Sequence, residues 1–245
     1  MRSSNSHPRI SFDRLEPRSM LAGLPELIDL VPGAGASNAE SYTNVNNTVF
    51  FVAVDSTHGR ELWKTDGTSA GTQMVKDIQI GVAGSNPFYL TNVNGKLFFR
   101  ANNGTDGQEL WVSDGTAAGT VLVKDIRPGV NESITKFLTN VNGTLFFSAD
   151  DGVTGQELWK SDGTAAGTVL VKDLNPTLNF GSNPSELQNV NGALMFAADG
   201  WLWRSNGTTV GTEKLPANPT RDLCNVNGTL FFAAFDSVNG EELWK

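Results

Sequence analysis

The eight residues Glu109-Leu-Trp-Val-Ser-Asp-Gly-Thr116 decide the fold, because the chain repeats them at a nearly constant spacing. Close copies begin at Glu61 and Glu157, a divergent copy begins at Trp201, and the sequence ends within a fifth copy, Glu242-Leu-Trp-Lys245. The central tryptophans, separated by 48, 48, 44 and 41 residues, are Trp63, Trp111, Trp159, Trp203 and Trp244. A second marker, Asn-Val-Asn followed by Gly or Asn, begins at Asn44, Asn92, Asn140, Asn189 and Asn225. Five copies of two markers indicate five structural repeats.

Within one repeat, residues 136–174, strand and turn signals alternate. The pair Asn142-Gly143 is typical of a two-residue hairpin turn, because both positions tolerate a positive φ. The β-rich runs Thr144–Ala149, Glu157–Lys160 and Val169–Leu174 are separated by Gly and Asp. Together with the strand before the turn, they predict four short antiparallel strands, the composition of a propeller blade. We therefore predict an all-β fold, a five-bladed β-propeller of four-stranded antiparallel blades.

The boundaries follow from the repeats. We expect a basic, disordered leader over residues 1–23 and the propeller over residues 24–245. The last blade lacks a fourth strand, and Leu27-Ile-Asp-Leu-Val-Pro-Gly33 aligns with Val123-Lys-Asp-Ile-Arg-Pro-Gly129, which ends the second blade. We expect residues 24–33 to complete the last blade and close the ring, since closure leaves no sheet edge unpaired. The alternative is a part of a longer array. The predicted blades occupy about 38–80, 86–128, 134–176, 185–217 and 221–245.

Composition excludes several classes of function. The formal net charge is −8, and no basic stripe is present, which argues against nucleic-acid binding. No run of apolar residues is long enough for a transmembrane helix. Cys224 is the only cysteine, so no internal disulfide is available, and we interpret it as structural. We expect a monomer.

The repeated motif resembles the bacterial ELWxxDGT repeat family, over nearly all of residues 24–245. The fourth repeat departs from it, because Trp201 and Asn206 replace the Glu and the Asp; we expect that blade not to do what the acidic pair does. In addition, Leu15-Glu-Pro-Arg-Ser-Met-Leu21 resembles the LEPR-XLL segment at the start of planctomycete-type surface proteins. These resemblances imply an exported protein, extracellular or on the cell surface, without a defined activity.

The repeated polar and aromatic residues have a structural interpretation. Asp66, Asp114 and Asp162 lie in Asp-Gly turns, where the carboxylate binds nearby backbone amides, and their position is similar to that of the Asp box of sialidase propellers. The five central tryptophans are predicted to pack between blades. Trp201 lies outside the repeat pattern and is our candidate for an exposed, ligand-binding aromatic residue.

Metal binding has weak support. Asp106, Asp150 and Asp151 offer oxygen ligands suited to calcium, but their loops do not follow the Asp-x-Asn-x-Asp-Gly pattern that ends in a Glu. We therefore expect no cofactor, with calcium as the alternative.

Catalysis is not expected. The only histidines, His7 and His58, are isolated, and no Ser–His–Asp set is evident. Glycosidase propellers use carboxylates unique to particular blades, whereas here the carboxylates mostly repeat. We predict a non-catalytic structural or interaction module of an exported or cell-surface bacterial protein, whose partner is an unknown protein or glycan. The alternative is a lectin-like propeller that binds glycans in pockets between blades, and a glycosidase-like propeller enzyme comes third.

Overall fold

The computed structural model describes residues 27–31, 35–177 and 181–245. The predicted leader and the LEPR-XLL-like segment lie outside the described residues. In the described ranges, five antiparallel sheets follow one another along the chain. Four of them contain four strands each: β1 (Glu40–Val45), β2 (Thr48–Asp55), β3 (Gly59–Thr65) and β4 (Gln73–Lys76); β5 (Phe88–Val93), β6 (Lys96–Asn102), β7 (Gln108–Ser113) and β8 (Val121–Lys124); β9 (Lys136–Val141), β10 (Thr144–Asp150), β11 (Gln156–Ser161) and β12 (Val169–Lys172); β13 (Ser185–Val190), β14 (Ala193–Ala198), β15 (Trp201–Ser205) and β16 (Thr212–Lys214). The fifth contains β17 (Pro219–Val226), β18 (Thr229–Asp236) and β19 (Gly240–Trp244).

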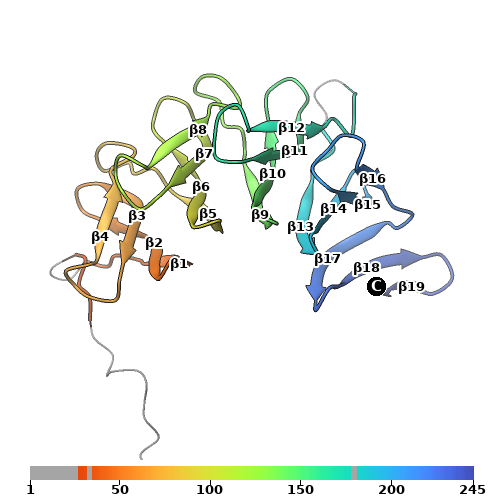
Figure 1. The fold of residues 1–245 in the computed structure, drawn as a ribbon, viewed down its shortest axis with the longest axis horizontal. Coiled ribbons are helices and arrows are strands. Elements are labelled where there is room, and N and C mark those ends of the chain that lie inside the picture. The colour runs from red at the N-terminus through yellow and green to blue at the C-terminus, as the bar shows by residue number, and fades with distance from the viewer. Residues whose placement is uncertain (1–26, 32–34, 178–180) are drawn as a thin grey trace, which may run out of the picture.

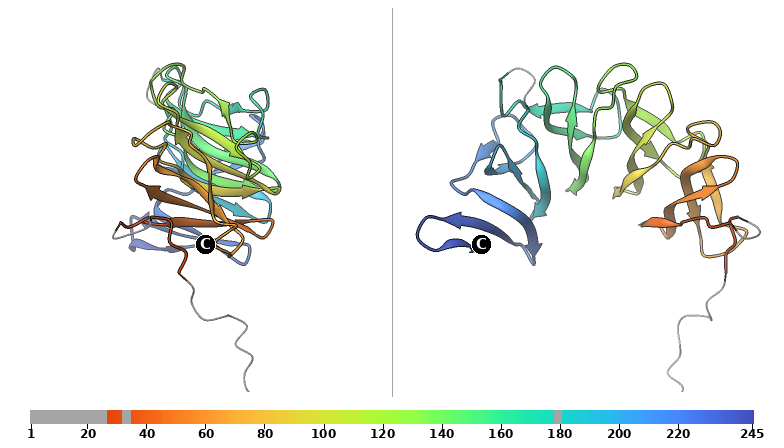
Figure 2. Two further views of the ribbon diagram at one scale, coloured as in Figure 1. Left: turned by 90° about the vertical axis from the view of Figure 1, so that its left-hand side faces the viewer. Right: turned by 180° about the vertical axis from the view of Figure 1, so that it is seen from behind.

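The sheets stand side by side as blades along an open arc (Figure 1). The first strands of the blades, from β1 to β17, line the concave side, and the fourth strands face the convex side; Figure 2 shows the same arrangement from behind. This order confirms the all-β, propeller-type fold of repeated antiparallel blades that the sequence predicts.

The hairpin turns between the first and second strands of the second to fifth blades have the backbone conformation that their Asn-Gly pairs favour. Asn142 and Gly143 both adopt positive φ, at 51° and 82°, the combination that a tight turn of this kind needs. The side chain of Asn140 fixes the turn, because its Oδ1 accepts a hydrogen bond from the Gly143 amide at 2.9 Å.

Neighbouring blades are joined by the same set of contacts at successive interfaces. Asn142 donates from Nδ2 to the Gly192 carbonyl at 3.0 Å, and the equivalent bond links Asn94 to Gly143. Apolar clusters lie between the blades as well. In the cluster between the second and third blades, Phe98 and Leu110 of one blade pack with residues of the next that include Trp159. Burial of these side chains from both neighbours explains why the strands read as continuous apolar runs.

The predicted closure of the ring is not seen. The two ends of the arc lie apart (Figures 1 and 2), and the sheet that contains β19 has three strands. Residues 27–31 form no strand and lie at the first blade, where Leu30 packs with Phe51 and Trp63. Leu30 and Ala39 cover the apolar face of the first blade, where Phe51, Ala53 and Trp63 are buried. Residues 24–26 and 32–34 of the predicted closing strand lie outside the described residues. No helix in the described ranges is long and apolar enough to cross a membrane.

Candidate functional site: the concave inner groove

The glutamate of the repeated motif binds the segment that connects its blade to the next. Glu109 is fully buried; its two carboxylate oxygens accept hydrogen bonds from the amides of Ser133 at 3.0 Å and Ile126 at 3.1 Å, which belong to the segment leading to the next blade. Burial raises the pKa of Glu109 to about 7. Glu61 and Glu157 hold the equivalent connections, and burial raises their pKa values too. These carboxylates are therefore used by the scaffold.

The aspartate of the motif holds a turn. Asp162 Oδ1 accepts hydrogen bonds from the amide and the hydroxyl of Thr164, at 2.8 and 2.7 Å. Asn206 makes the same two bonds to Thr208, at 3.0 and 2.8 Å. The expectation that the fourth blade does not do what the acidic pair does was therefore wrong for the aspartate, because an amide oxygen also accepts both bonds of this turn. At the glutamate position, Trp201 has no carboxylate to accept such bonds.

The glycine of the motif serves both the turn and the interface. Gly163 has a φ of 90°, and a Cβ added to it would lie 3.0 Å from the Phe98 ring of the preceding blade. Only glycine meets both requirements without strain.

Three of the five central tryptophans, Trp111, Trp159 and Trp203, pack between blades. Trp63 packs with Leu30 at the first blade, and Trp244 is 40% exposed. Trp159 is 5% exposed, and Lys124 of the preceding blade places its Nζ 5.6 Å from the ring centroid. The same ammonium donates to the Thr168 carbonyl at 2.9 Å, so one side chain both covers the ring and joins the two blades. Trp111 and Trp203 have equivalent lysine neighbours, Lys76 and Lys172.

Trp201, the candidate ligand-binding residue, is half-buried. It packs against the cluster between the third and fourth blades, and Lys214 Nζ lies 3.2 Å from its ring centroid. One face of the ring is thus already occupied by a cation.

The calcium candidates already have partners, either within their own loops or, for Asp150, in the segment before the third blade. Asp150 pairs with Arg127 at 2.8 Å, and Asp151 accepts the amides of Val153 and Thr154. Asp106 accepts from Asn103 Nδ2 at 2.7 Å. Within the described residues, no three potential metal ligands of the His, Cys, Asp or Glu type gather at one point.

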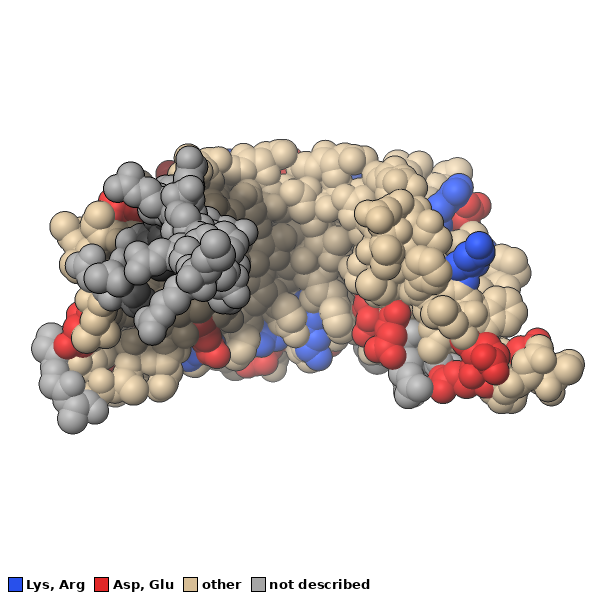
Figure 3. All heavy atoms as spheres, turned by 90° about the horizontal axis from the view of Figure 1, so that it is seen from below, with Lys and Arg blue, Asp and Glu red and all other residues tan. Residues whose placement is uncertain are grey.

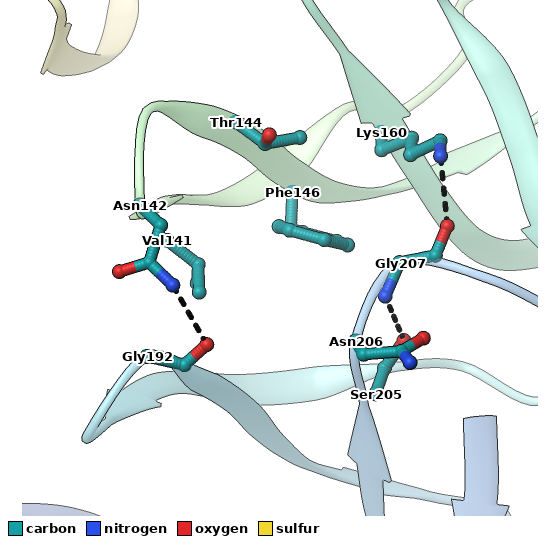
Figure 4. Close-up of a pocket in the computed structure, with 9 residues that line it drawn as sticks. All are labelled: Val141, Asn142, Thr144, Phe146, Lys160, Gly192, Ser205, Asn206 and Gly207. Atoms are coloured by element: carbon teal, nitrogen blue, oxygen red, sulfur yellow. Dashed lines mark hydrogen bonds between the residues drawn. The ribbon is translucent and has the colours of Figure 1, made fainter. Parts of the chain in front are cut away.

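The pocket between the third and fourth blades is small, and the side chains of Asn142, Lys160 and Ser205 in its lining are hydrogen-bonded (Figure 4). It has a volume of about 140 Å³, below the roughly 300–1,000 Å³ of typical ligand sites. Lys160 closes one side by donating to the Gly207 carbonyl at 2.8 Å, and Asn142 closes the other through Gly192. Its lining residues therefore connect the two blades, and the pocket is not our candidate ligand site.

A larger groove runs along the concave side of the arc. It has a volume of about 370 Å³ and crosses β5, β9 and β13, the inner strands of the second, third and fourth blades. We call it the inner groove; it is lined by Tyr89, Leu90, Thr91, Phe137, Leu138, Thr139, Glu186, Leu187 and Gln188. Its floor is continuous, because Thr91 and Thr139 each donate from the hydroxyl to a carbonyl of the next blade, at 3.3 Å in both cases. Figure 3 looks into the concave side, where the central hollow is mostly uncharged and charged side chains gather along the rim.

Each inner strand carries a bulge with one residue in the left-handed region. The residues are Ser41, Tyr89, Phe137, Glu186 and Asp222, with φ between 55° and 61°. The pairing of each inner strand with its neighbour shifts register at this point. A left-handed conformation at a residue other than glycine costs about 1–2 kcal/mol, and bulges often reorient side chains at functional sites. Three of the five bulge residues line the inner groove.

Two arginines support the aromatic residues at one end of the groove. Arg100 lies over the rings of Phe88 and Tyr89, at 5.2 and 5.3 Å, and Arg60 lies over Phe88 at 4.6 Å. Phe88 and Tyr89 remain about 40% exposed. Exposed aromatic rings with neighbouring arginines are typical of residues that contribute most to binding at protein surfaces.

Sequence reasoning missed this groove, although a signal was present. The residue before Leu-Thr-Asn-Val is Tyr89 in the second repeat and Phe137 in the third, whereas the four residues that follow it are the same in both. Variable positions directly before a constant run could have identified the inner edge as the place where the repeats differ.

Comparison with known proteins supports the type of fold and gives no information on function. No family model matches the sequence, and no curated protein does. Among solved structures, a puromycin hydrolase matches with a TM-score of 0.52 and 15% identity, over 84% of this chain and 35% of that one. The tricorn protease matches with a TM-score of 0.37 and 11% identity, over 75% and 23%. An endo-arabinase from Bacteroides thetaiotaomicron matches with a TM-score of 0.33 and 12% identity, over 84% and 96%.

The chain spans about a third of the length of the puromycin hydrolase that it resembles. At this identity the likeness concerns the backbone alone. Together with the five repeated antiparallel sheets, it shows that the chain is similar to β-propeller domains.

Proposed function

We propose that the chain is a non-catalytic interaction module of an exported or cell-surface bacterial protein, and that its partner binds along the inner groove. The observation that carries this proposal is the row of left-handed bulge residues with different side chains at one position of successive repeats. The motif residues around them serve the turns and interfaces, so this position is free to set specificity. A strained conformation that every repeat retains has a reason if it orients side chains toward a binding partner.

The location outside the cell rests on two resemblances. The repeated motif resembles the bacterial ELWxxDGT family, and residues 15–21 resemble the LEPR-XLL segment of planctomycete-type surface proteins. Accessibility of the chain to an added protease on intact cells would support the location, and full protection would contradict it.

A carbohydrate partner is the second candidate. Tyr89 and Phe137 present aromatic rings to the groove, and Glu186 and Gln188 add polar groups beside them. This combination suits the apolar face and the hydroxyls of a sugar. The groove is a better place for such a ligand than the pocket of Figure 4, because it is more than twice as large.

Binding to cell envelopes of the encoding organism tests the proposal. We expect saturable binding of the purified chain, and a loss of about tenfold or more in affinity for the double variant Tyr89→Ser/Glu186→Ser. Both substitutions introduce the residue that the first repeat carries as Ser41, so the bulges are retained. The matched control is Val153→Ser/Val210→Ser, which alters exposed apolar residues outside the groove.

The treatment of the envelopes distinguishes the partners. Loss of binding after protease treatment indicates a protein, and loss after periodate oxidation indicates a glycan. A glycan array run with calcium and with EDTA then identifies the sugar and tests the calcium alternative. Absence of saturable binding would contradict the interaction module, and equal binding by the groove variant would exclude the groove.

A further inference from the structure

The two ends of the arc carry the two halves of one blade interface. The complete clusters between blades take a Val, a Phe, a Leu and a residue of the connecting segment from one blade, and a Phe, an Ala and a Trp from the next. At the first blade, only the second half is present: Phe51, Ala53 and Trp63, together with Leu30. The equivalents of the first half lie in the fifth blade, at Val226, Phe231 and Leu243.

The half-interface on the fifth blade is open. Leu243 is 75% exposed and Val226 is 48% exposed. The residues equivalent to Leu243 in the first three blades, Leu62, Leu110 and Leu158, are fully buried. Exposed apolar side chains at positions that the fold elsewhere buries indicate an interface without its partner.

The segment before the first blade already occupies the place of a preceding blade. The Val54 amide donates to the Ser37 carbonyl at 2.7 Å, as Asp150 donates to Ser133 at 2.7 Å between the second and third blades. Leu30, which aligns with Ile126, packs on Trp63 as Ile126 packs in the cluster with Trp159. Residues 27–31 and 35–39 therefore take the position of the connection from a missing blade.

We call a buried glutamate and the two backbone amides that it accepts a carboxylate clip. The parts of one such clip are divided between the two ends of the arc in the same way. In the second blade, Glu109 holds the amides of Ser133 and Ile126. The equivalents of these two residues are Ser37 and Leu30 at the start of the chain, and the equivalent of Glu109 is Glu242 in β19, which is exposed. Glu242 thus lacks the connecting segment that its counterparts hold, and Ser37 lacks the glutamate.

We propose that β19 of one chain receives the N-terminal segment and first blade of a second copy, head to tail, with Glu242 of one copy accepting hydrogen bonds from Ser37 and Leu30 of the other. Both open ends of the arc face the same side, at the bottom of Figure 1, so a two-fold axis brings both pairs of ends together. The partner interface then completes the fifth apolar cluster and covers the edge of β19. This inference concerns the ends of the arc and does not depend on the function proposed for the inner groove.

A second copy fits better than closure within one chain. The four interfaces between blades keep the same bonds, for example the Asn-to-Gly bonds of 3.2, 3.0, 3.0 and 2.9 Å, and so fix the curvature of the arc. Bringing the separated ends of one chain together would have to break this regular set. A dimer requires no change in the angle between blades. It differs from the monomer that we expected from the sequence.

The test is the mass of the full chain in solution, measured by light scattering or sedimentation over a wide range of concentration. We expect twice the chain mass of 26.3 kDa. Glu242→Ala and Leu243→Arg, both at exposed positions, weaken the dimer by about tenfold or more, because they remove a charged hydrogen-bond acceptor and an apolar contact. Glu132→Ala, which removes an exposed carboxylate far from both ends, leaves the mass unchanged.

Mixing variants gives a second, independent readout. Ser37→Pro removes the backbone amide that Glu242 would accept, and a mixture of Glu242→Ala and Ser37→Pro chains contains dimers with one intact clip. Such a mixture is expected to dimerise more tightly than either variant alone. A single-chain mass at every concentration, including a compact closed monomer by small-angle scattering, would overturn the proposal. A dimer that neither end variant weakens would overturn it as well.

Discussion

At the scale of single residues, each position of the repeated motif has a definite partner. The glutamate holds the connection to the next blade, the tryptophan lies under a lysine of the preceding blade, and the aspartate and threonine close a turn. The buried glutamates are the least usual of these, because no cation in the described part of the chain forms an ion pair with them and burial favours their protonated form.

The pKa of Glu109 leads to a dependence of stability on pH. The pKa rises from 4.5 in the unfolded chain to about 7 in the folded one, so the folded state binds more protons between these values. Stability is therefore highest below pH 4.5 for this group and falls as the pH rises to 7, by roughly 3 kcal/mol. We expect Glu109→Gln to reduce the fall in melting temperature between pH 4.5 and 7. Glu132→Gln, at an exposed position, is the control, and an unchanged slope for Glu109→Gln would contradict the assignment.

At the scale of elements, the inner strands combine a regular ladder with one strained residue each. The turn and the interface bonds fix each strand at one end, whereas the bulge shifts its register at the other. The strain belongs to the backbone, so glycine should relieve it at a bulge and should only weaken a regular strand position.

Glu186 and Ser185 in β13 provide a matched pair for this effect. Glu186 has a φ of 55°, and Ser185 is not among the residues with positive φ. Glu186→Gly is expected to raise the free energy of unfolding by about 0.5 kcal/mol, because relief of the left-handed strain exceeds the entropy cost of glycine. Ser185→Gly is expected to lower it by a similar amount. Denaturant unfolding measures both, and a loss of stability for both variants would show that the bulge is not strained.

At the scale of the whole molecule, the blades form a nearly one-dimensional array. The third blade has a neighbour on each side, whereas the first and fifth have one. In such arrays the stability of a repeat depends on its own fold and on its adjacent interfaces.

Hydrogen exchange should follow this order. We expect the slowest exchange in β10 and β11 and the fastest in β17, β18 and β19 of the monomeric Leu243→Arg variant, since the edge of β19 is uncovered. In the unaltered chain at high concentration, the proposed dimer should slow exchange in β19 selectively. Equal exchange rates along the arc would show that the blades unfold as one unit instead.

The sequence by itself determined the repeat, the class of each element and the local role of the turn residues. Asn142 and Gly143 predict a hairpin turn because their φ preferences are local. The packing role of Trp159 was also accessible, because its spacing recurs with the blade. These properties depend on residues close together in the chain, and five copies reinforced the signal.

The tertiary structure alone decided the curvature, the groove and the state of the two ends. The alignment of residues 27–33 with the end of the second blade indicates the type of interface that they fit. The angle between successive blades decides whether they reach β19 of the same chain. The left-handed conformation of Tyr89 likewise depends on pairing with β6 and not on local preference. Such features arise from contacts between residues far apart in the chain, and small differences in packing at each interface add up along the arc.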